Sequence, residues 1–176
     1  LAGSHLVKAA IGENIDNESL GGSKTHCDIS GVTDYSCKDD KEAISIIKEL
    51  IGQMQKKSTL CFSRIESKPP KKSINEVYGI LPKDRDTPYE MREILERIVD
   101  DSFLREYKAT YGKTLICAYA RIDGWSVGII ANQRKMVKNG KGEMQLGGVI
   151  YSDSADKAAR FIMNCNQKKI PLVFIK

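Results

Sequence analysis

The stretch from Leu20 to Asp40, reading LGGSKTHCDISGVTDYSCKDD, holds most of the residues in this chain that could take part in chemistry. Its Gly21-Gly22 pair lets the backbone adopt positive φ and lets a ligand or another backbone come close. Ser30 bonds readily to free main-chain N–H groups, and His26 lies between these features. The pattern predicts a loop beside a ligand. It also fits a purely structural loop, because no triad or metal-ligand spacing is present.

The overall composition argues against several classes of protein. The 176 residues carry a formal net charge of +5, with 41% hydrophobic and 29% charged residues, which is typical of a globular domain. The lysines are scattered along the chain, so we expect a solvated surface and no nucleic-acid partner. No apolar run approaches the roughly 18 residues that a membrane-spanning helix needs, so we expect no membrane association.

The cysteines indicate neither a disulfide framework nor a zinc site. There are five, an odd number, and no C-x-x-C pair occurs. Cys117 and Cys165 fall on apolar faces of a predicted strand and a predicted helix, where cysteine behaves as a small core residue. We therefore assign no metal ligand and no catalytic side chain in this chain.

The first third of the sequence predicts helices. A helix over residues 3–11 and a second short turn should end at Gly12 and at the Gly21-Gly22 pair, because glycine commonly ends helices. Asp40 or the aspartate before it should then cap a long amphipathic helix. Its apolar positions follow the helical period and predict one buried stripe: Ala43, Ile46, Ile47, Leu50, Ile51 and Met54.

The middle of the sequence predicts a connection and then a new helix. Residues 56–73 are polar, contain two adjacent prolines, and are interpreted as a link between domains. Beyond this link, Thr87 is the predicted N-cap of a helix that runs to about Val99, with Glu90 completing a capping box.

The last third predicts a hairpin, a helix and a strand. Residues 114–122 and 125–131 are strand-like runs separated by an Asp-Gly pair, which favours a tight two-residue turn. Residues 136–148 predict a mobile loop. The helix that follows should lead into the apolar strand 170–175, an order typical of a parallel sheet covered on both faces. It should bury Ala155, Ala158, Ala159 and Ile162.

These elements predict an α/β chain in two partial domains. Residues 1–57 would be the closing part of one domain, residues 58–85 the connection, and residues 86–176 the opening part of a second. We therefore expect the chain to be part of a longer polypeptide.

Several stretches resemble one family, in that family's own order and over nearly the whole chain. Besides the segment described first, they are LAGSHLVKAAIGE, INEVYGILPKDRDTPYEMREILERIVDD, FLREYKATYGKTLICAYARIDGWSVGIIANQ and SADKAARFIMNCNQKKIPLVFIK. The chain resembles the carboxyltransferase (β) subunit of biotin-dependent acyl-CoA carboxylases, of the propionyl-CoA and methylcrotonyl-CoA carboxylase type. The resemblance implies two crotonase-like domains, each a spiral of β-β-α turns, with this chain across their junction.

The resemblance also implies a reaction and its partners. A carboxyl group would move from carboxybiotin to an acyl-CoA enolate, with biotin carried on a partner domain or subunit and a coenzyme A thioester as substrate. Biotin carboxylase and biotin carrier subunits would be partners, and the subunit would form a dimer-based homo-oligomer, up to a hexamer. The family's oxyanion loops should lie before Leu1 and after Lys176, so this segment alone should be inactive. The implied location is the cytoplasm, or the mitochondrial matrix in a eukaryote.

By its match to the family's LGG…H…SGV segment, the chain has a set of candidates for positions beside the CoA or biotin cleft. For His26, an ordinary packed or surface histidine without a ligand role stays an alternative. The chain departs from propionyl-type members after Gln133, where Arg134 replaces a proline and a longer lysine-rich loop follows, so the acyl-CoA stays open. The candidates are Gly21, Gly22, His26, Ser30 and Gly31.

Two other readings compete with the carboxyltransferase. One is the α subunit of a biotin-dependent decarboxylase of the glutaconyl-CoA or methylmalonyl-CoA type, which runs the transfer in reverse. The other is a non-enzymatic basic binding module, which would need its lysines on one face and an affinity for nucleic acid that falls steeply with salt.

Overall fold

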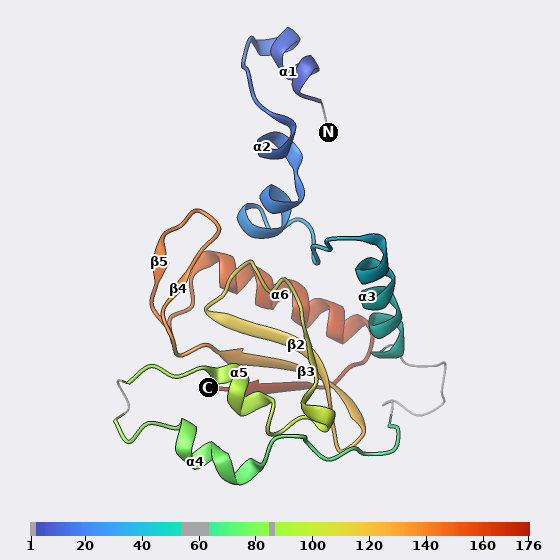
Figure 1. Cartoon of the computed structure of the whole chain (residues 1–176), viewed down its shortest axis with the longest axis vertical. Coiled ribbons are helices and arrows are strands. Elements are labelled where there is room, and N and C mark those ends of the chain that lie inside the picture. The colour runs from blue at the N-terminus through green and yellow to red at the C-terminus, as the bar shows by residue number, and fades with distance from the viewer. Residues whose placement is uncertain (1–2, 54–63, 85–86) are drawn as a thin grey trace.

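The computed structural model describes residues 3–53, 64–84 and 87–176. Its centre is a four-stranded sheet in the order β1-β2-β3-β6 (Figure 1). Strands β1, β2 and β3 pair antiparallel, and β6 lies parallel to β3. The four strands are β1 (Leu104–Glu106), β2 (Leu115–Ile122), β3 (Trp125–Asn132) and β6 (Leu172–Ile175).

The predicted hairpin is confirmed by β2 and β3. Ile122 pairs with Trp125 across a two-residue turn. Asp123 and Gly124 have φ of 50° and 77°, as a type I′ turn requires. The carboxylate of Asp100 accepts hydrogen bonds from both turn N–H groups, at 2.8 and 2.7 Å. A side chain more than twenty residues upstream therefore stabilises this turn.

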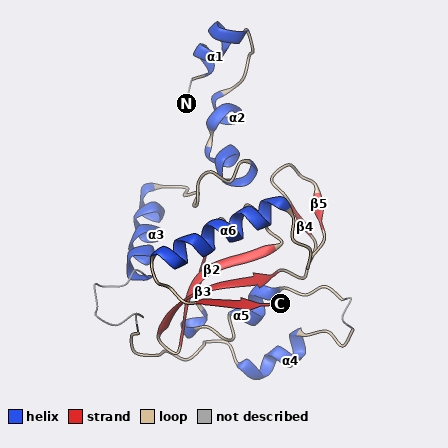
Figure 2. Ribbon diagram, turned by 180° about the vertical axis from the view of Figure 1, so that it is seen from behind, coloured by secondary structure: helices blue, strands red, loops and turns tan. Residues whose placement is uncertain are grey.

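Helix α6 (Ser152–Gln167) covers one face of the sheet (Figure 2). Phe161 and Cys165 of α6 pack on Cys117, Tyr119 and other side chains of a buried cluster. The predicted helix and the following parallel strand are confirmed. The predicted buried face is only partly right, because Ala158 and Ile162 are half-buried against this cluster whereas Ala155 and Ala159 are exposed. The buried positions are Ser154, Lys157, Phe161 and Cys165.

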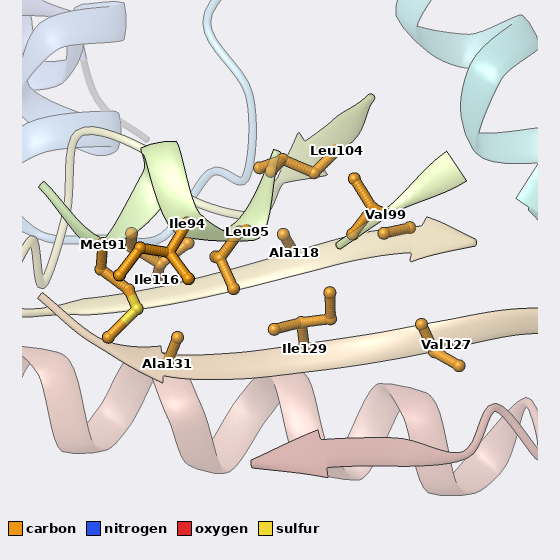
Figure 3. Close-up of a cluster of buried hydrophobic side chains, with 11 residues drawn as sticks. Met91, Ile94, Leu95, Val99, Leu104, Ile116, Ala118, Val127, Ile129 and Ala131 are labelled. Carbon is orange, nitrogen blue, oxygen red and sulfur yellow. The ribbon is translucent and has the colours of Figure 1, made fainter. Parts of the chain in front are cut away.

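Helix α5 (Met91–Leu95) covers the opposite face of the sheet. Its buried side chains meet the alternate residues of β2 and β3 (Figure 3). The other face of each strand contributes to the cluster under α6. The labelled members are Met91, Ile94, Leu95, Val99, Leu104, Ile116, Ala118, Val127, Ile129 and Ala131.

The start and length of α5 differ from prediction. The N-cap is Glu90 rather than Thr87, because the Glu90 carboxylate accepts from the backbone N–H of Arg92. The helix ends at Leu95, where the backbone tightens into bonds between residues three apart, such as Ile98 N–H to Leu95 O. The predicted capping box is therefore wrong, although the core-facing positions 91, 94, 95 and 99 are buried as expected.

The N-terminal helices lie apart from the sheet, and Figure 1 shows α1 and α2 extending away from it. Helix α1 (Ser4–Ile11) ends at Gly12, which has φ of 76°, and α2 (Asn17–Gly21) is capped by the Asp16 carboxylate. Both confirm the prediction. The stripe predicted for α3 (Asp40–Gln53) is only partly right, because Ile46 is buried but Ile47 and Ile51 are 54% and 60% exposed.

The end of α3 and the residues that precede α3 contact the sheet through the cluster under α6. Tyr35 and Leu50 are half-buried against that cluster. Arg105 of β1 forms an ion pair with Glu49 of α3. The fully buried members of both clusters come from residues 91–170. The earlier residues therefore pack onto a core made by the later ones.

Short elements complete the described chain. Residues 136–148, predicted as a mobile loop, contain a small antiparallel hairpin instead, with Val137 paired to Gln145. The elements are η1 (Thr25–Ile29), η2 (Ile74–Glu76), α4 (Val77–Ile80), η3 (Asp100–Ser102), β4 (Val137–Lys138) and β5 (Met144–Gln145).

Candidate functional site

Four of the five predicted site residues lie in or beside η1, a single turn of π-helix. Gly22 caps α2 and accepts a hydrogen bond from the His26 N–H at 3.1 Å, and Ser30 N–H closes the π turn on Thr25 O at 3.0 Å. Such turns are rare and occur frequently at functional sites. The sequence cluster from 21 to 31 is therefore a compact structural unit, and we call residues 25–34 the π segment.

The His26 ring has one local neighbour. Its Nδ1 lies 3.4 Å from Ser30 Oγ. Its Nε2 is buried and has no hydrogen-bond partner among the described residues. The adjacent Cys27 is buried, and its Sγ lies 2.8 Å from Thr33 Oγ1. The structure thus brings His26 and Ser30 together and gives the cysteine thiol a different partner.

Different structural constraints require glycine at the predicted glycine positions. Gly31 has φ of +61°, and a Cβ there would lie 2.7 Å from the ring of Tyr111. Gly22 has an ordinary φ of −71°, but a Cβ would lie 2.7 Å from the carbonyl oxygen of Glu18. Gly21 is the last residue of α2. Gly31 therefore combines a positive φ, which a larger residue would adopt only with strain, with a close approach, whereas Gly22 is required by close approach alone.

A cavity of about 360 Å³ lies beside the π segment. This volume is within the range of small-molecule pockets, about 300–1,000 Å³. The β4–β5 hairpin closes one side tightly, since a Cβ on Gly140 would lie 1.9 Å from the Asp28 carbonyl oxygen. The π segment contributes Asp28 and Ile29 to the lining, but none of the five predicted residues lines this cavity. The other lining residues are Tyr111, Asn139, Gly140, Lys141, Glu143, Gln145, Tyr151, Ser152 and Asp153.

The charges of the cavity lining favour a ligand that carries neutral hydrogen-bond donors or positive charge. Asp28, Glu143 and Asp153 outnumber Lys141 among its charged side chains. Burial, followed by the charges of Asp156 and Asp153, raises the pKa of Tyr111, so its hydroxyl stays protonated.

Lys108 and Tyr111 were missed by sequence reasoning. Lys108 has a fully buried side chain whose Nζ contacts Gly31 O at 2.6 Å and Asp34 Oδ1 at 2.6 Å. A lysine followed by Ala-Thr-Tyr-Gly gives no pattern that separates it from a solvated turn, so only the fold identifies it.

Residues 3–53, 64–84 and 87–176 contain no group of three or more His, Cys, Asp or Glu placed to hold a metal ion. Within the same ranges, no helix is both long and apolar enough to cross a membrane.

Comparison with known proteins decides the family. The model of the carboxyl transferase domain matches residues 1–176. The chain belongs to the carboxyl transferase domain family. The resemblance predicted from the sequence is thereby confirmed.

Curated members of the carboxyl transferase family align over the full chain. The methylcrotonoyl-CoA carboxylase beta chain of Dictyostelium discoideum is 41% identical over 176 residues, covering 100% of this chain and 28% of the relative. The biotin-dependent 3-methylcrotonyl-coenzyme A carboxylase beta1 subunit of Mycobacterium tuberculosis is 40% identical over 176 residues, covering 100% and 31%. The chain thus spans about 30% of the length of these relatives.

A solved carboxyl transferase structure supports the fold. Transcarboxylase 12S, determined with methylmalonyl-coenzyme A and methylmalonic acid bound, superposes with a TM-score of 0.83 at 32% identity, covering 98% of this chain and 32% of that one. The β2-β3-α6 unit followed by the parallel strand β6 is one β-β-α turn of the predicted crotonase-like spiral. The predicted α/β fold class is confirmed.

Proposed function

We propose that this chain is part of a carboxyltransferase that moves a carboxyl group from carboxybiotin to an acyl-CoA enolate. The observation that carries the proposal is the superposition of nearly the whole chain on transcarboxylase 12S, a protein solved with an acyl-CoA bound. The curated relatives, named as biotin-dependent or methylcrotonoyl-CoA carboxylase β chains, support the same reaction class.

The proposed carboxyl transfer requires the protein to stabilise an enolate. Removing a proton from an acyl thioester places negative charge on the carbonyl oxygen, and preorganised N–H groups can stabilise that charge by several kcal/mol. We propose that those donors lie in parts of the polypeptide outside this chain, and that this chain supplies supporting surface. No side chain of the π segment is assigned to proton transfer.

We propose that the π segment, together with Gly21 and Gly22 shortly before it, lies beside the CoA or biotin cleft. The candidates are Gly21, Gly22, His26, Ser30 and Gly31. The buried and unpartnered Nε2 of His26 supports this placement, because an orphaned polar atom inside a protein is costly unless a further group completes it.

The proposal extends to the assembly. Biotin would be carried by a partner domain or subunit, a biotin carboxylase would charge it, and the β subunits would form a dimer-based homo-oligomer. We place the division between two carboxyltransferase domains within residues 58–85. The enzyme would act in the cytoplasm, or in the mitochondrial matrix in a eukaryote.

The test uses the enzyme that contains this segment, with its biotin-carrying partner, ATP and labelled bicarbonate. We expect label to enter propionyl-CoA or methylcrotonyl-CoA, and avidin to abolish the transfer. Which of the two accepts label defines the acyl-CoA class. Biotin-dependent loss of the carboxyl group without net carboxylation would support the decarboxylase instead, and salt-sensitive binding to nucleic acid without either reaction would support the binding module.

The isolated 176-residue chain provides a second test. Because both sets of oxyanion donors are proposed to lie outside it, we expect no carboxyl transfer above background from free carboxybiotin to either acyl-CoA. Clear turnover by the isolated chain would contradict the placement of the active site.

A further inference from the structure

Lys108 is an unusual residue in this fold. Its side chain is 0% exposed, although lysine is almost never fully buried without partners. It lies in the turn between β1 and β2. Its φ of 47° is in the left-handed region, which residues other than glycine rarely adopt. Burial and strained backbone together show that this lysine is held in place by its surroundings.

Three oxygen atoms of the π segment surround the Lys108 ammonium group. Nζ donates to Gly31 O at 2.6 Å and to Thr33 O at 3.1 Å, and it forms an ion pair with Asp34 Oδ1 at 2.6 Å. An ammonium group has three protons to donate. All three therefore have an acceptor within one short loop that lies about 75 residues earlier in the chain.

The neighbours of Lys108 hold the same loop. The Tyr111 ring lies where a Cβ on Gly31 would be, and Tyr111 N–H donates to Lys108 O at 3.1 Å, which closes the turn. The Tyr107 ring meets the Tyr35 ring edge-on at 6.5 Å. The turn from 107 to 111 thus contacts the π segment and the residue after it at three separate points.

These contacts continue to His26. Thr33, whose carbonyl accepts from Lys108, donates its N–H to His26 O at 3.2 Å. The Thr33 hydroxyl lies 2.8 Å from Cys27 Sγ. Gly31, the other carbonyl partner, directly follows Ser30, whose hydroxyl is the neighbour of the His26 ring. Displacing the Lys108 ammonium group would therefore release residues 31–34, which follow His26 and bond to its carbonyl oxygen through Thr33.

We propose that Lys108 is a positioning residue for carboxyl transfer, which acts by holding the π segment, and with it His26, against the sheet. This inference rests on the proposed function. A 1 Å displacement of a positioning group can change the rate on the order of 100-fold, so a buried anchor of this kind has a kinetic role beyond stability.

A matched control exists in the same chain. Lys157 of α6 is also 0% exposed, and its Nζ contacts Leu115 O at 3.0 Å and Glu106 Oε1 at 3.3 Å. Glu106 keeps Arg92 as a second partner, at 3.1 Å. Lys157 thus anchors α6 to the sheet with chemistry similar to that of Lys108, but none of its contacts reaches the π segment.

The experiment compares Lys108→Met with Lys157→Met in the complete enzyme. Methionine keeps the aliphatic length and removes the charge, and Asp34 is 46% exposed, so its carboxylate stays solvated. The measurements are melting temperature, amide hydrogen exchange over residues 25–35, and kcat/KM for the acyl-CoA. Asp34→Asn, a milder change at a half-exposed position that removes the ion pair and alters the contact with the Tyr107 hydroxyl, is measured alongside.

We expect both methionine variants to lower the melting temperature. Only Lys108→Met should speed exchange over residues 25–35 and lower kcat/KM, by about 10-fold or more, and Asp34→Asn should shift both measurements in the same direction by less. Lys157→Met should leave kcat/KM of the folded enzyme within about two-fold.

Every other result either supports or overturns one of the two proposals. If Lys108→Met matches Lys157→Met in exchange and kinetics, or loosens the loop without a kinetic loss, the positioning role is overturned. If Lys108→Met does not fold, an unchanged exchange rate and kcat/KM in Asp34→Asn overturn it, and a loss in both supports it. Absence of carboxyl transfer in the unmodified enzyme would instead overturn the proposed function, and the exchange measurement would still test the anchor.

Discussion

Residues 87–176 and residues 3–53 differ in how many of their apolar side chains are buried. In the later region, the alternate residues of β2 and β3 fill two buried clusters, one under α5 and one under α6. In the earlier region, the buried apolar side chains among the described residues are Cys27 and Ile46, while Leu6 and Ile11 are 61% and 66% exposed. The comparison shows that the later region makes its own core, and that the earlier region packs against it through Tyr35 and Leu50.

The two regions also differ in the interactions that hold them. Apolar burial, worth about 25 cal/mol per Å², stabilises the sheet and its two helices. The π segment is held by a buried ammonium group, by close backbone approaches at Gly31 and Gly140, and by one aromatic ring. Such polar anchors fix position well but contribute less net free energy, since both partners lose hydration when they meet.

The largest expected effect is at the centre of the cluster under α6. Phe161 is 0% exposed and contacts the rings of Tyr107 and Tyr119 at centroid distances of 5.5 and 4.8 Å. We expect Phe161→Ala to lower the free energy of unfolding by about 3–5 kcal/mol, measured by urea denaturation. Ile47→Ala in α3, whose side chain is 54% exposed, should cost less than about 0.5 kcal/mol. Similar losses for the two variants would contradict the contrast between the regions.

A smaller effect is expected where the two regions meet. Gly31 and Gly142 both have positive φ, but a Cβ on Gly31 would strike the Tyr111 ring whereas Gly142 has open space around it. We expect Gly142→Ala to cost about 1 kcal/mol from backbone strain alone and Gly31→Ala to cost more, as measured by thermal melts. If the π segment borders the cleft, Gly31→Ala should also raise KM or lower kcat in the complete enzyme. Unaltered kinetics would remove this segment from the site.

The smallest expected effect is electrostatic and lies at the rim of the later region. Burial alone would raise the pKa of Glu96, but Lys72 and Arg92 outweigh burial and hold its pKa below the usual range. The folded pKa is thus lower than the unfolded value of about 4.3, so the stabilisation is complete above that value and is lost as pH falls through the folded pKa. Urea midpoints measured from about pH 6 to pH 3 should fall less steeply in Glu96→Gln. The exposed Glu66→Gln serves as the control, and equal slopes in both variants would exclude this contribution.

Much of the later region could be predicted from the sequence because its signals are local. An Asp-Gly pair between two apolar runs specifies the β2–β3 turn, and the apolar strand after α6 specifies parallel pairing. The face of α6 could be predicted only in part. Lys157 has the sequence context of a solvent-exposed residue until the fold brings Leu115 O and Glu106 to its ammonium group, and two of the alanines expected in the core, Ala155 and Ala159, are exposed.

The same reason limits prediction of the candidate site. Sequence reasoning found the glycines and His26 because residue type alone identifies them. It missed Lys108 and Tyr111, whose role depends on oxygen atoms and a glycine about 75 residues away. It also missed the Glu90 cap of α5, since that carboxylate is held by Gln133, which follows β3 and lies 43 residues later in the chain.

The two-residue turn at Asp123-Gly124 has a consequence for the order in which the chain folds. Its strands need to close only a tiny loop, and hairpins of this kind form in about 1–10 μs. The contact between Lys108 and Gly31 spans 77 residues, and closing longer loops costs more chain entropy before any contact rewards it. We therefore expect the hairpin to form early and the π segment to become ordered late, so that a newly made chain would complete its sheet before the proposed ligand-binding surface takes shape.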